Sequence, residues 1–333
     1  MHLVSRKNID TSYVDTQLIN GIFTAIGYIK HTRNPIIRFF RFYKLYKKEF
    51  NKLKTIDLIH LNVLYPFGVL LLFFNKIPFV ISEHWTGYLS ERAKKISLFQ
   101  KILSKQIAKK AAFICPVSIN LQEAMIQIGL NGNYQPVPNV VNTNLFTVKK
   151  KKEQELSIIH ISNMNDEHKN ISGMLRAAKH LENVIPNFTW KFIGGEAAPY
   201  HQLITSLNFK SATIKFINHL PQIRLVNELQ KSHVLVLNSR FENLPCVILE
   251  AFSCGIPVIT TNVGGIAEYF PNNFGKFIKL NDDSDLAKRI VEVKNSKFAD
   301  AEEMHVYAEK HFGIRSIANQ FDSVYLNALK LTQ

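Results

Sequence analysis

The chain has 333 residues, of which 46 % are hydrophobic and 20 % are charged, a globular composition with enough length for two domains of about 150 residues each. It contains no run of about 20 apolar residues, so we expect no membrane-spanning helix. The three cysteines, Cys115, Cys246 and Cys254, lie in apolar surroundings, and we expect them to be reduced core residues of a cytoplasmic protein.

The net charge of +15 is concentrated in the first half of the chain. Residues 1–150 hold 21 Lys and Arg against 7 Asp and Glu, whereas residues 151–333 hold 20 against 19. The cations are interleaved with aromatic residues in RFFRFYKLYKKEF and recur in ERAKKISLFQKILSKQIAKK. Such a surface suits anionic lipid, polyphosphate or nucleic acid, and a solvated lysine-rich face explains it equally well.

Strand-like and helical segments alternate along the chain. In the first half, IDLIHLNV, IPFVISEH and AAFICPVS read as strands with helices between them, and PVPNVVNTNLFTVKKKKEQE reads as a linker. From about residue 155 the strands LSIIHIS, TWKFIGG, ATIKFI, HVLVLNS and PVITTN alternate with helical patterns, the last of which is GGIAEYF. This alternation predicts a parallel sheet covered by helices on both faces, with ligands at the carboxyl ends of the strands.

The stretch RFENLPCVILEAFSCGIP, residues 240–257, carries two glutamates eight positions apart. Glu242 follows a buried strand, Pro245 suits the first position of a helix, and Gly255 ends that helix. Glu250 lies about a turn and a half into the helix. Fixed carboxylates of this kind recognise the vicinal hydroxyls of a sugar or a ribose, although acids near a helix start are also stabilised by the helix dipole, by about 0.3–1 kcal/mol.

Polar residues also follow three other predicted strands. Gly264 and Gly265 precede a predicted helix, where their N–H groups suit a diphosphate or simply permit a tight bend. Lys169, in HISNMNDEHKNISG, is placed to pair with phosphate oxygens or to be a solvated loop lysine, and we expect no ligand role for His168. His84, in IPFVISEHWTGYL, is either a sugar-binding or a structural histidine.

One acidic cluster resembles a metal site but has a simpler interpretation. NDDSDL directly precedes the helical pattern LAKRIVEV, so its aspartates are expected to cap that helix and to lie in its first turn. We therefore expect no metal site, and no cofactor.

Five of these features occur in order across residues 136–270: PNVVNTNLF, Lys169 before its helix, FIGG, SRFENLPCVILEAFSCGIPVI and NVGGIAE. Together they resemble the retaining glycosyltransferases of family 4, which have the GT-B fold. The resemblance implies an α/β protein with two Rossmann-like, doubly wound parallel-sheet domains that face a cleft. The expected boundaries are an acceptor-side domain at 1–146, a nucleotide-sugar domain at 147–312, and a C-terminal helix at 313–333 that packs back toward the first domain.

The resemblance also implies roles for individual residues. Glu242 and the backbone of Asn243 and Leu244 would hold the donor sugar, with Glu242 and His84 forming the catalytic pair. Glu250 would bind the nucleotide ribose, and Lys169 would pair with the diphosphate in place of a metal. The donor side would be completed by Gly194, Gly264, Gly265 and Glu268.

Two departures from the family pattern stand out. Many members carry an Arg shortly before the Lys, where this chain has Asn163. Members also open with a strand and a glycine-rich loop, whereas MHLVSRKN is similar to the family's second strand, and Gly21 and Gly27 do not form such a loop. We therefore expect the N-terminal domain to be incomplete, through a truncated gene model or in an inactive protein.

The implied function is a metal-independent hexosyltransferase that uses a nucleotide-diphosphate sugar and a glycan or lipid-linked acceptor, with retention of configuration. A cytoplasmic enzyme of envelope polysaccharide or lipopolysaccharide synthesis, peripheral on the anionic inner face of the plasma membrane, fits the basic first half. The alternatives are a GT-B sugar-nucleotide epimerase and a truncated non-catalytic homologue. A nucleic-acid partner is not expected, because it leaves Glu242 and Glu250 unexplained.

Overall fold

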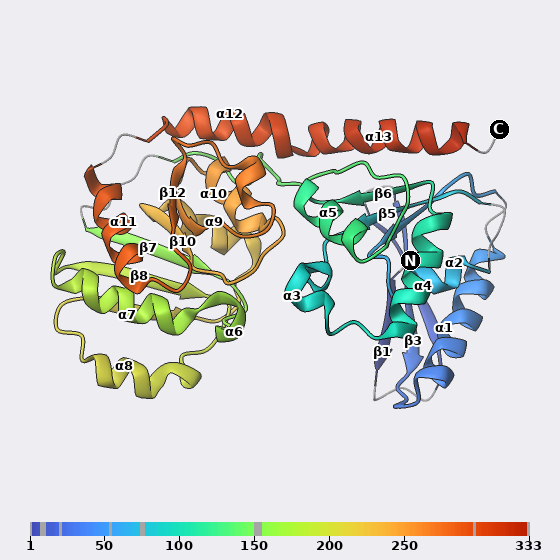
Figure 1. The fold of residues 1–333 in the computed structure, drawn as a ribbon, viewed down its shortest axis with the longest axis horizontal. Coiled ribbons are helices and arrows are strands. Elements are labelled where there is room, and N and C mark those ends of the chain that lie inside the picture. The colour runs from blue at the N-terminus through green and yellow to red at the C-terminus, as the bar shows by residue number, and fades with distance from the viewer. Residues whose placement is uncertain are drawn as a thin grey trace. The chain divides into compact units, whose positions relative to one another are not determined.

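The computed structural model describes residues 2–6, 11–19, 22–52, 55–73, 77–149, 155–295 and 298–331 (Figure 1). The chain divides into two compact units. The first consists of residues 1–59 and 70–77, and the second of residues 60–69 and 78–333. All residues of the candidate site described below belong to the second unit.

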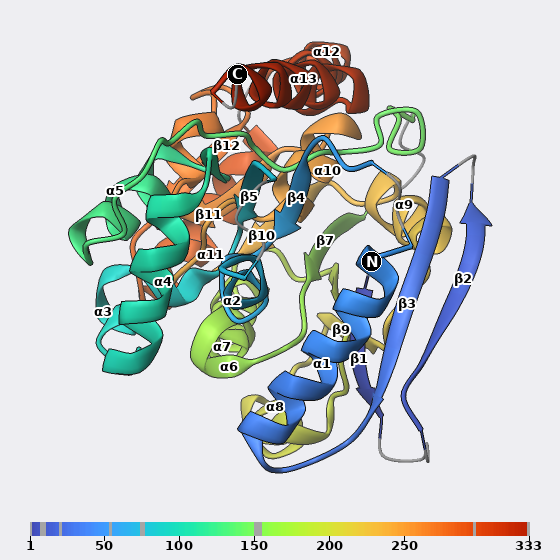
Figure 2. The same ribbon diagram turned by 90° about the vertical axis from the view of Figure 1, so that its right-hand side faces the viewer.

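The first unit contains a small sheet and a long helix (Figure 2). The sheet has the order β1-β3-β2, with β1 parallel and β2 antiparallel to β3. Helix α1 packs on β3, and it begins where Asn34 Oδ1 accepts hydrogen bonds from the N–H groups of Ile36 and Ile37. The bounds are β1 His2–Arg6, β2 Tyr13–Ile19, β3 Ile22–Lys30 and α1 Pro35–Phe50.

The antiparallel β2–β3 pair corrects the expectation of parallel sheets throughout. The sequence between the two strands is Asn20-Gly21, a pair typical of tight hairpin turns, and both residues lie outside the described ones. Gly27 lies in β3, opposite Leu3 and Val14, and is a strand residue. Parallel strands need a crossover connection of a dozen or more residues, so two strands separated by only two residues pair antiparallel.

The second unit begins with a three-stranded sheet of order β4-β5-β6, at the positions that the sequence predicts. Strands β5 and β6 are parallel, and every residue of β5 is buried. The strands are β4 Ile59–Asn62, β5 Phe79–Glu83 and β6 Phe113–Pro116. The helices are the 3₁₀ turn η1 Thr86–Tyr88, α3 Ser90–Ala93, α4 Leu98–Lys110 and α5 Ile119–Gln127, and α2 Gly68–Leu71 belongs partly to each unit.

A six-stranded, all-parallel sheet follows, with the order β12-β11-β10-β7-β8-β9. The first strand, β7, lies in the middle, and later strands are added on one side and then on the other. The strand order thus reverses between β7 and β10, which is where an open parallel sheet binds its ligand. The strands are β7 Leu156–Ile161, β8 Phe188–Ile193, β9 Thr213–Ile217, β10 Val234–Leu237, β11 Val258–Thr261 and β12 Gly275–Ile278.

The sheet is held by apolar packing on both faces. Strands β10 and β11 are buried at every residue, as expected for central parallel strands. Trp190 and Phe192 of β8 stack at 5.5 Å between ring centroids and belong to a core to which α7 adds Ile171, Met174 and Leu175. The covering elements are α6 Asp166–Lys169, α7 Ile171–Glu182, η2 Ala198–Tyr200, α8 His201–Leu207, α9 Gln222–Gln230, α10 Cys246–Ser253, η3 Ile266–Tyr269 and α11 Asp283–Asn295.

Two further helices close the chain, α12 (Ala301–Phe312) and α13 (Ile314–Lys330), and they follow one another across the second unit (Figure 1). Helix α12 packs on α10, and α13 packs on β5. Tyr325 on α13 shares a hydrogen bond of 2.6 Å with His60 Nδ1. The two sheets of the second unit are thus joined by one helical segment.

The structure tests the expected cap of α11 and the expected burial of the cysteines. Asp282 Oδ1 accepts a hydrogen bond of 2.9 Å from the N–H of Asp285, so the predicted acidic cap of α11 is confirmed. Cys115 and Cys254 are buried, but Cys246 is exposed in the first turn of α10, and the expectation of three core cysteines is wrong for that residue.

Candidate functional site

Two loops meet at the point where the strand order reverses. The β7 loop (162–170) contains α6 and ends in Lys169 and Asn170, and the β10 loop (238–245) carries Glu242. Lys169 Nζ donates a hydrogen bond to Glu242 Oε1, and the Glu242 residue is only 5 % exposed. The structure therefore brings together two residues that the sequence singled out 73 positions apart.

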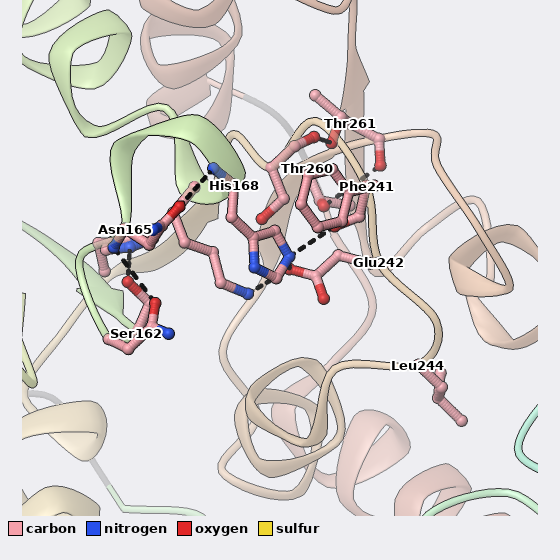
Figure 3. Close-up of polar contacts among 12 residues, drawn as sticks. Ser162, Asn165, His168, Phe241, Glu242, Leu244, Thr260 and Thr261 are labelled. Carbon is pink, nitrogen blue, oxygen red and sulfur yellow. Dashed lines mark hydrogen bonds and ion pairs between the residues drawn. The ribbon is translucent and has the colours of Figure 1, made fainter. Parts of the chain in front are cut away.

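His168 completes this cluster, although nothing in the sequence alone assigned it a role. Its ring stacks on Phe241 at 4.1 Å between centroids, and its Nε2 donates a hydrogen bond of 2.7 Å to the carbonyl oxygen of Phe241 (Figure 3). The same Nε2 lies 3.4 Å from Glu242 Oε1. Its place beside Lys169 in one short loop is the signal that could have identified it.

The surroundings keep Glu242 ionised. Burial raises the pKa of its carboxyl group, but the neighbouring His168 and the charge and hydrogen bond of Lys169 outweigh burial, and the net pKa lies below the ordinary value. The carboxylate therefore remains a hydrogen-bond acceptor at neutral pH, as recognition of sugar hydroxyls requires.

Arg240 ties the two loops into one body. Its backbone N–H donates to His168 O at 2.8 Å, and its Nη1 donates to Asp166 O at 2.5 Å. Its Nη2 donates to Asn170 Oδ1 at 2.7 Å. Because these bonds join the ends of β7 and β10, the separation of Lys169 and Glu242 is fixed by backbone as well as by their own contact.

The residues after Glu242 connect to the other sheet of the second unit. Asn243 Nδ2 donates to His84 O at 2.7 Å, and Asn139 Nδ2 donates to Leu244 O at 2.6 Å. Asn243 and Leu244 are only 5 % and 4 % exposed. His84 is thus held next to the β10 loop through its backbone.

Glu83 fixes the β5 loop (83–89), to which His84 belongs. Its carboxylate is fully buried and accepts hydrogen bonds from the N–H groups of Leu64, His84 and Trp85 at 2.9, 2.9 and 2.8 Å. Burial raises the pKa of Glu83, and the three N–H groups oppose that rise. Burial also lowers the pKa of His84, which favours the neutral imidazole at neutral pH.

The Gly264-Gly265 pair packs directly beneath the β10 loop. Gly264 has φ +61°, and a Cβ there would lie 1.8 Å from Glu242 O, so only glycine fits. The N–H of Gly265 donates to Asn243 O at 3.0 Å. The predicted helix after this pair is wrong, because the structure forms only the 3₁₀ turn η3.

Glu268 and Gly194 also have defined surroundings. The two oxygens of Glu268 accept hydrogen bonds of 2.7 Å from the N–H groups of Ile119 and Asn120, so that Glu268 caps α5. Gly194, at the end of β8, has φ +116°, and a Cβ there would lie 2.1 Å from Ser162 O. Both residues shape the loops at the carboxyl edge of the sheet.

Glu250 lies on α10 behind the β10 loop, where burial raises its pKa to about 7. Helix α10 begins after Pro245, one residue later than expected, and Gly255 (φ +66°) follows its end. Among the described residues, Glu250 Oε2 is buried without a hydrogen-bond partner, as are Asn243 Oδ1 and both amide atoms of Asn238. Buried polar atoms without protein partners are rare, and these lie on the same βα crossover as Glu242.

The second unit is therefore a two-sheet α/β arrangement with polar groups at the switch point of its larger sheet. A sequence model of the group 1 glycosyl transferases matches residues 141–311, and one of glycosyltransferase family 4 matches residues 8–145. The chain belongs to the group 1 glycosyl transferases.

Curated relatives agree with this family. The chain is 24 % identical over 238 residues to a phosphatidylinositol N-acetylglucosaminyltransferase of Arabidopsis thaliana, covering 69 % of this chain and 52 % of the relative. It is 26 % identical over 221 residues to N-acetyl-alpha-D-glucosaminyl L-malate synthase of Bacillus anthracis, covering 60 % and 55 %. The chain spans about half the length of these curated relatives.

Solved structures show the same GT-B fold. Sucrose-phosphate synthase of Thermosynechococcus elongatus superposes with a TM-score of 0.80 at 18 % identity, over 99 % of this chain and 88 % of that one. Anabaena HepE in complex with UDP gives a TM-score of 0.72 at 20 % identity, over 89 % and 85 %. The expected GT-B fold class, with two Rossmann-like domains, is thus confirmed.

The Lys169–Glu242 pair makes a quantitative prediction for stability. Lys169→Met leaves the buried carboxylate without its cation and should lower the free energy of unfolding by about 3 kcal/mol. Adding Glu242→Gln should recover part of that loss, because the uncompensated charge is gone. Urea unfolding of the single and double variants measures this coupling.

Lys231→Met is the matched control, since Lys231 is 54 % exposed and pairs with Glu228 at 3.2 Å. It should cost less than about 1 kcal/mol. Equal losses for the two lysine variants, or strict additivity in the double variant, would contradict a buried and coupled pair.

Proposed function

We propose that this protein transfers a hexose from a nucleotide-diphosphate sugar to a glycan or lipid-linked acceptor, with retention of configuration and without a metal. The observation that carries the proposal is the Lys169–Glu242 pair at the switch point of the parallel sheet, with Glu250 one crossover helix behind it. Family membership supplies the reaction class.

Each part of a donor has a matching group on the described residues. Glu250, with its partnerless Oε2, would take the ribose diol, and Lys169 would pair with the diphosphate beside the N-terminus of α7. Glu242 and the loop through Asn243 and Leu244 would hold the sugar. The solved HepE structures include complexes with UDP and with UDP-glucose, which makes uridine nucleotides the first donors to test.

The chemistry requires stabilisation of a leaving group. The bond between C1 of the sugar and the diphosphate oxygen breaks, and a bond from the acceptor oxygen to C1 forms on the same face. The acceptor proton passes to the departing phosphate oxygen. The cation of Lys169 and the start of α7 would stabilise the developing negative charge, and the neutral His84 would donate to the sugar.

The acceptor is proposed to carry an anionic group. The names of three relatives specify phosphatidylinositol, L-malate and GlcNAc-diphosphoundecaprenol, the last for an Escherichia coli galactosyltransferase that is 33 % identical over 137 residues. All three contain phosphate or carboxylate. A role in envelope polysaccharide synthesis follows the same pattern, since a Vi polysaccharide biosynthesis protein is also a relative.

We place the reaction at an anionic membrane surface. None of the described helices combines the length and the apolar composition of a membrane span. Helix α4 exposes Leu98, Phe99 and Ile102 at 75 %, 67 % and 51 %, next to the exposed Lys95 and Lys105. Helix α1 independently exposes Ile36, Ile37 and Phe40 among Lys and Arg. Apolar side chains ringed by cations suit an interface with anionic lipid.

Glu242→Gln tests the proposed reaction. The wild-type protein, incubated with a panel of nucleotide-sugars and lipid-linked or glycan acceptors, should bind one nucleotide and form an α-linked product from an α-linked donor. Glu242→Gln should reduce transfer by more than about a hundredfold, because sugar contacts made in the transition state are lost. Product formation is measured by mass spectrometry and NMR.

Other outcomes of that panel identify the alternatives. Donor isomerised without any acceptor would indicate an epimerase, and nucleotide binding without turnover would indicate a non-catalytic homologue. Full transfer by Glu242→Gln would reject the role assigned to that residue.

Glu250→Gln should change the stability of the protein and its affinity for UDP in opposite directions. The folded-state pKa of Glu250 is raised to about 7, so the stability linked to its protonated form is present at low pH and is lost as the pH rises through about 7. The amide should therefore stabilise the protein by about 3 kcal/mol at about pH 8.5 and by only about 1 kcal/mol at about pH 5. The same change should weaken UDP binding, because the ribose loses its carboxylate.

Thermal unfolding at both pH values and calorimetric titration with UDP are the two measurements. A Glu250→Gln variant that is equally stable at both pH values relative to wild type, or that binds UDP normally, would contradict this assignment.

Vesicle co-sedimentation tests the membrane contact. The wild-type protein should bind phosphatidylserine vesicles and dissociate from them as the salt concentration rises. It should not bind phosphatidylcholine vesicles. Replacing Leu98, Phe99 and Ile102 by Ser should weaken binding without changing UDP affinity. Binding that is insensitive to salt, or unchanged in the triple variant, would count against α4 as the contact.

A further inference from the structure

A cavity with both polar and apolar walls lies beside the β10 loop, and Gly264 is the one residue proposed for the donor side that lines it. Its volume is about 360 Å³, and its walls come from α3, α5, the β10 loop and the loop that follows β11. The residues that matter for its chemistry are Arg92, Asn120, Glu123, Arg240, Phe241 and Gly264.

Arg92 lines this cavity and has a buried donor without a hydrogen-bond partner. Its guanidinium lies over the ring of Phe241, 4.1 Å from the centroid. Its Nε is buried and has no hydrogen-bond partner, and its side chain forms no ion pair with any of the described residues. A guanidinium that is partly removed from water and lacks an acid is poised for an oxyanion, which its planar donors fit in a bidentate manner.

Arg240 adds a second positive charge to the cavity, and no acid pairs with its side chain among the described residues. Its side-chain hydrogen bonds go to neutral oxygens, namely the carbonyls of Asp166 and Glu167 and the side chains of Asn170 and Asn281. Glu123 is the acid of the cavity wall, and it is exposed. Among the residues that line the cavity, two arginines stand against one exposed carboxylate, a balance that favours anions.

The cavity is in contact with the loop that carries Glu242. Phe241 directly precedes Glu242, and its ring is held by His168 as well as by Arg92. Gly264 packs against the backbone oxygen of Glu242. A molecule that fills the cavity would therefore lie next to the position proposed for the donor sugar.

We propose that this cavity is the acceptor subsite, and that Arg92 binds the phosphate or carboxylate of the acceptor. The inference rests on the proposed glycosyltransferase function and adds the residue that selects anionic acceptors. Arg240 supports it by charge alone, because its donors are already engaged. The cavity would thus place the anionic group of an acceptor next to the loop whose Glu242 is proposed to hold the donor sugar.

Calorimetric titration of the whole chain at saturating UDP tests this assignment with three probes: myo-inositol 1-phosphate, L-malate and uncharged myo-inositol. At least one of the two anions should bind the wild-type protein, and myo-inositol should bind much more weakly. Which anion binds distinguishes phosphate from carboxylate. Arg92→Gln should lower the affinity for that anion by about tenfold or more, and Arg92→Lys should lower the affinity less.

Glu123→Gln is the control, because it should change anion affinity in the opposite direction to Arg92→Gln. Removing the acid should leave anion affinity unchanged or raise it, which a merely structural disturbance of the cavity would not do. UDP affinity should be the same in all these variants.

The outcomes separate the two levels of the proposal. If wild-type protein binds UDP but neither anion, or if Arg92→Gln binds the anion normally, the subsite is refuted and the proposed function stands. If Arg92→Gln loses UDP and anion together, Arg92 only supports the loop, and the subsite is again refuted. If the wild-type protein binds no nucleotide, the proposed function itself fails.

Discussion

The structure of the site depends on one buried ion pair, that of Lys169 and Glu242. The Glu242 residue is 5 % exposed, and a carboxylate buried to that degree is costly unless a cation and further polar groups compensate it, as Lys169 and His168 do here. The pair lies where β7 and β10 adjoin and the strand order reverses. Arg240 also joins the two loops. The positions of the two charges are therefore fixed by the sheet and its loops, and do not depend on flexible side chains alone.

From this pair the order of the site extends outward. Each residue from Phe241 to Leu244 is held by a different partner: His168 for Phe241, Lys169 for Glu242, the carbonyl of His84 for Asn243 and Asn139 for Leu244. The β10 loop is thus fixed from both sheets of the second unit. Such preorganisation suits recognition of a sugar, since little ordering remains to be done when the ligand binds.

Much of this is predictable from sequence, because parallel strands end at one edge and polar residues after them must gather there. Lys169, Glu242 and Glu250 are identified in that way. What the sequence does not reveal are contacts that depend on tertiary packing: the stacking of His168 on Phe241, the three backbone donors of Glu83, and the cap that Glu268 provides to α5 across 149 positions. The β2–β3 pair is a different case, since the Asn20-Gly21 signal in the sequence is local and competes with the parallel pattern of the six-stranded sheet.

A crystal structure of the protein with UDP bound tests the central claim most directly. The account predicts Lys169 Nζ within about 3 Å of a diphosphate oxygen, the ribose hydroxyls on the Glu250 carboxylate, and Glu242 facing the space beyond the terminal phosphate. Nucleotide density at any other edge of the sheet, with the Lys169–Glu242 pair untouched by it, would contradict the account.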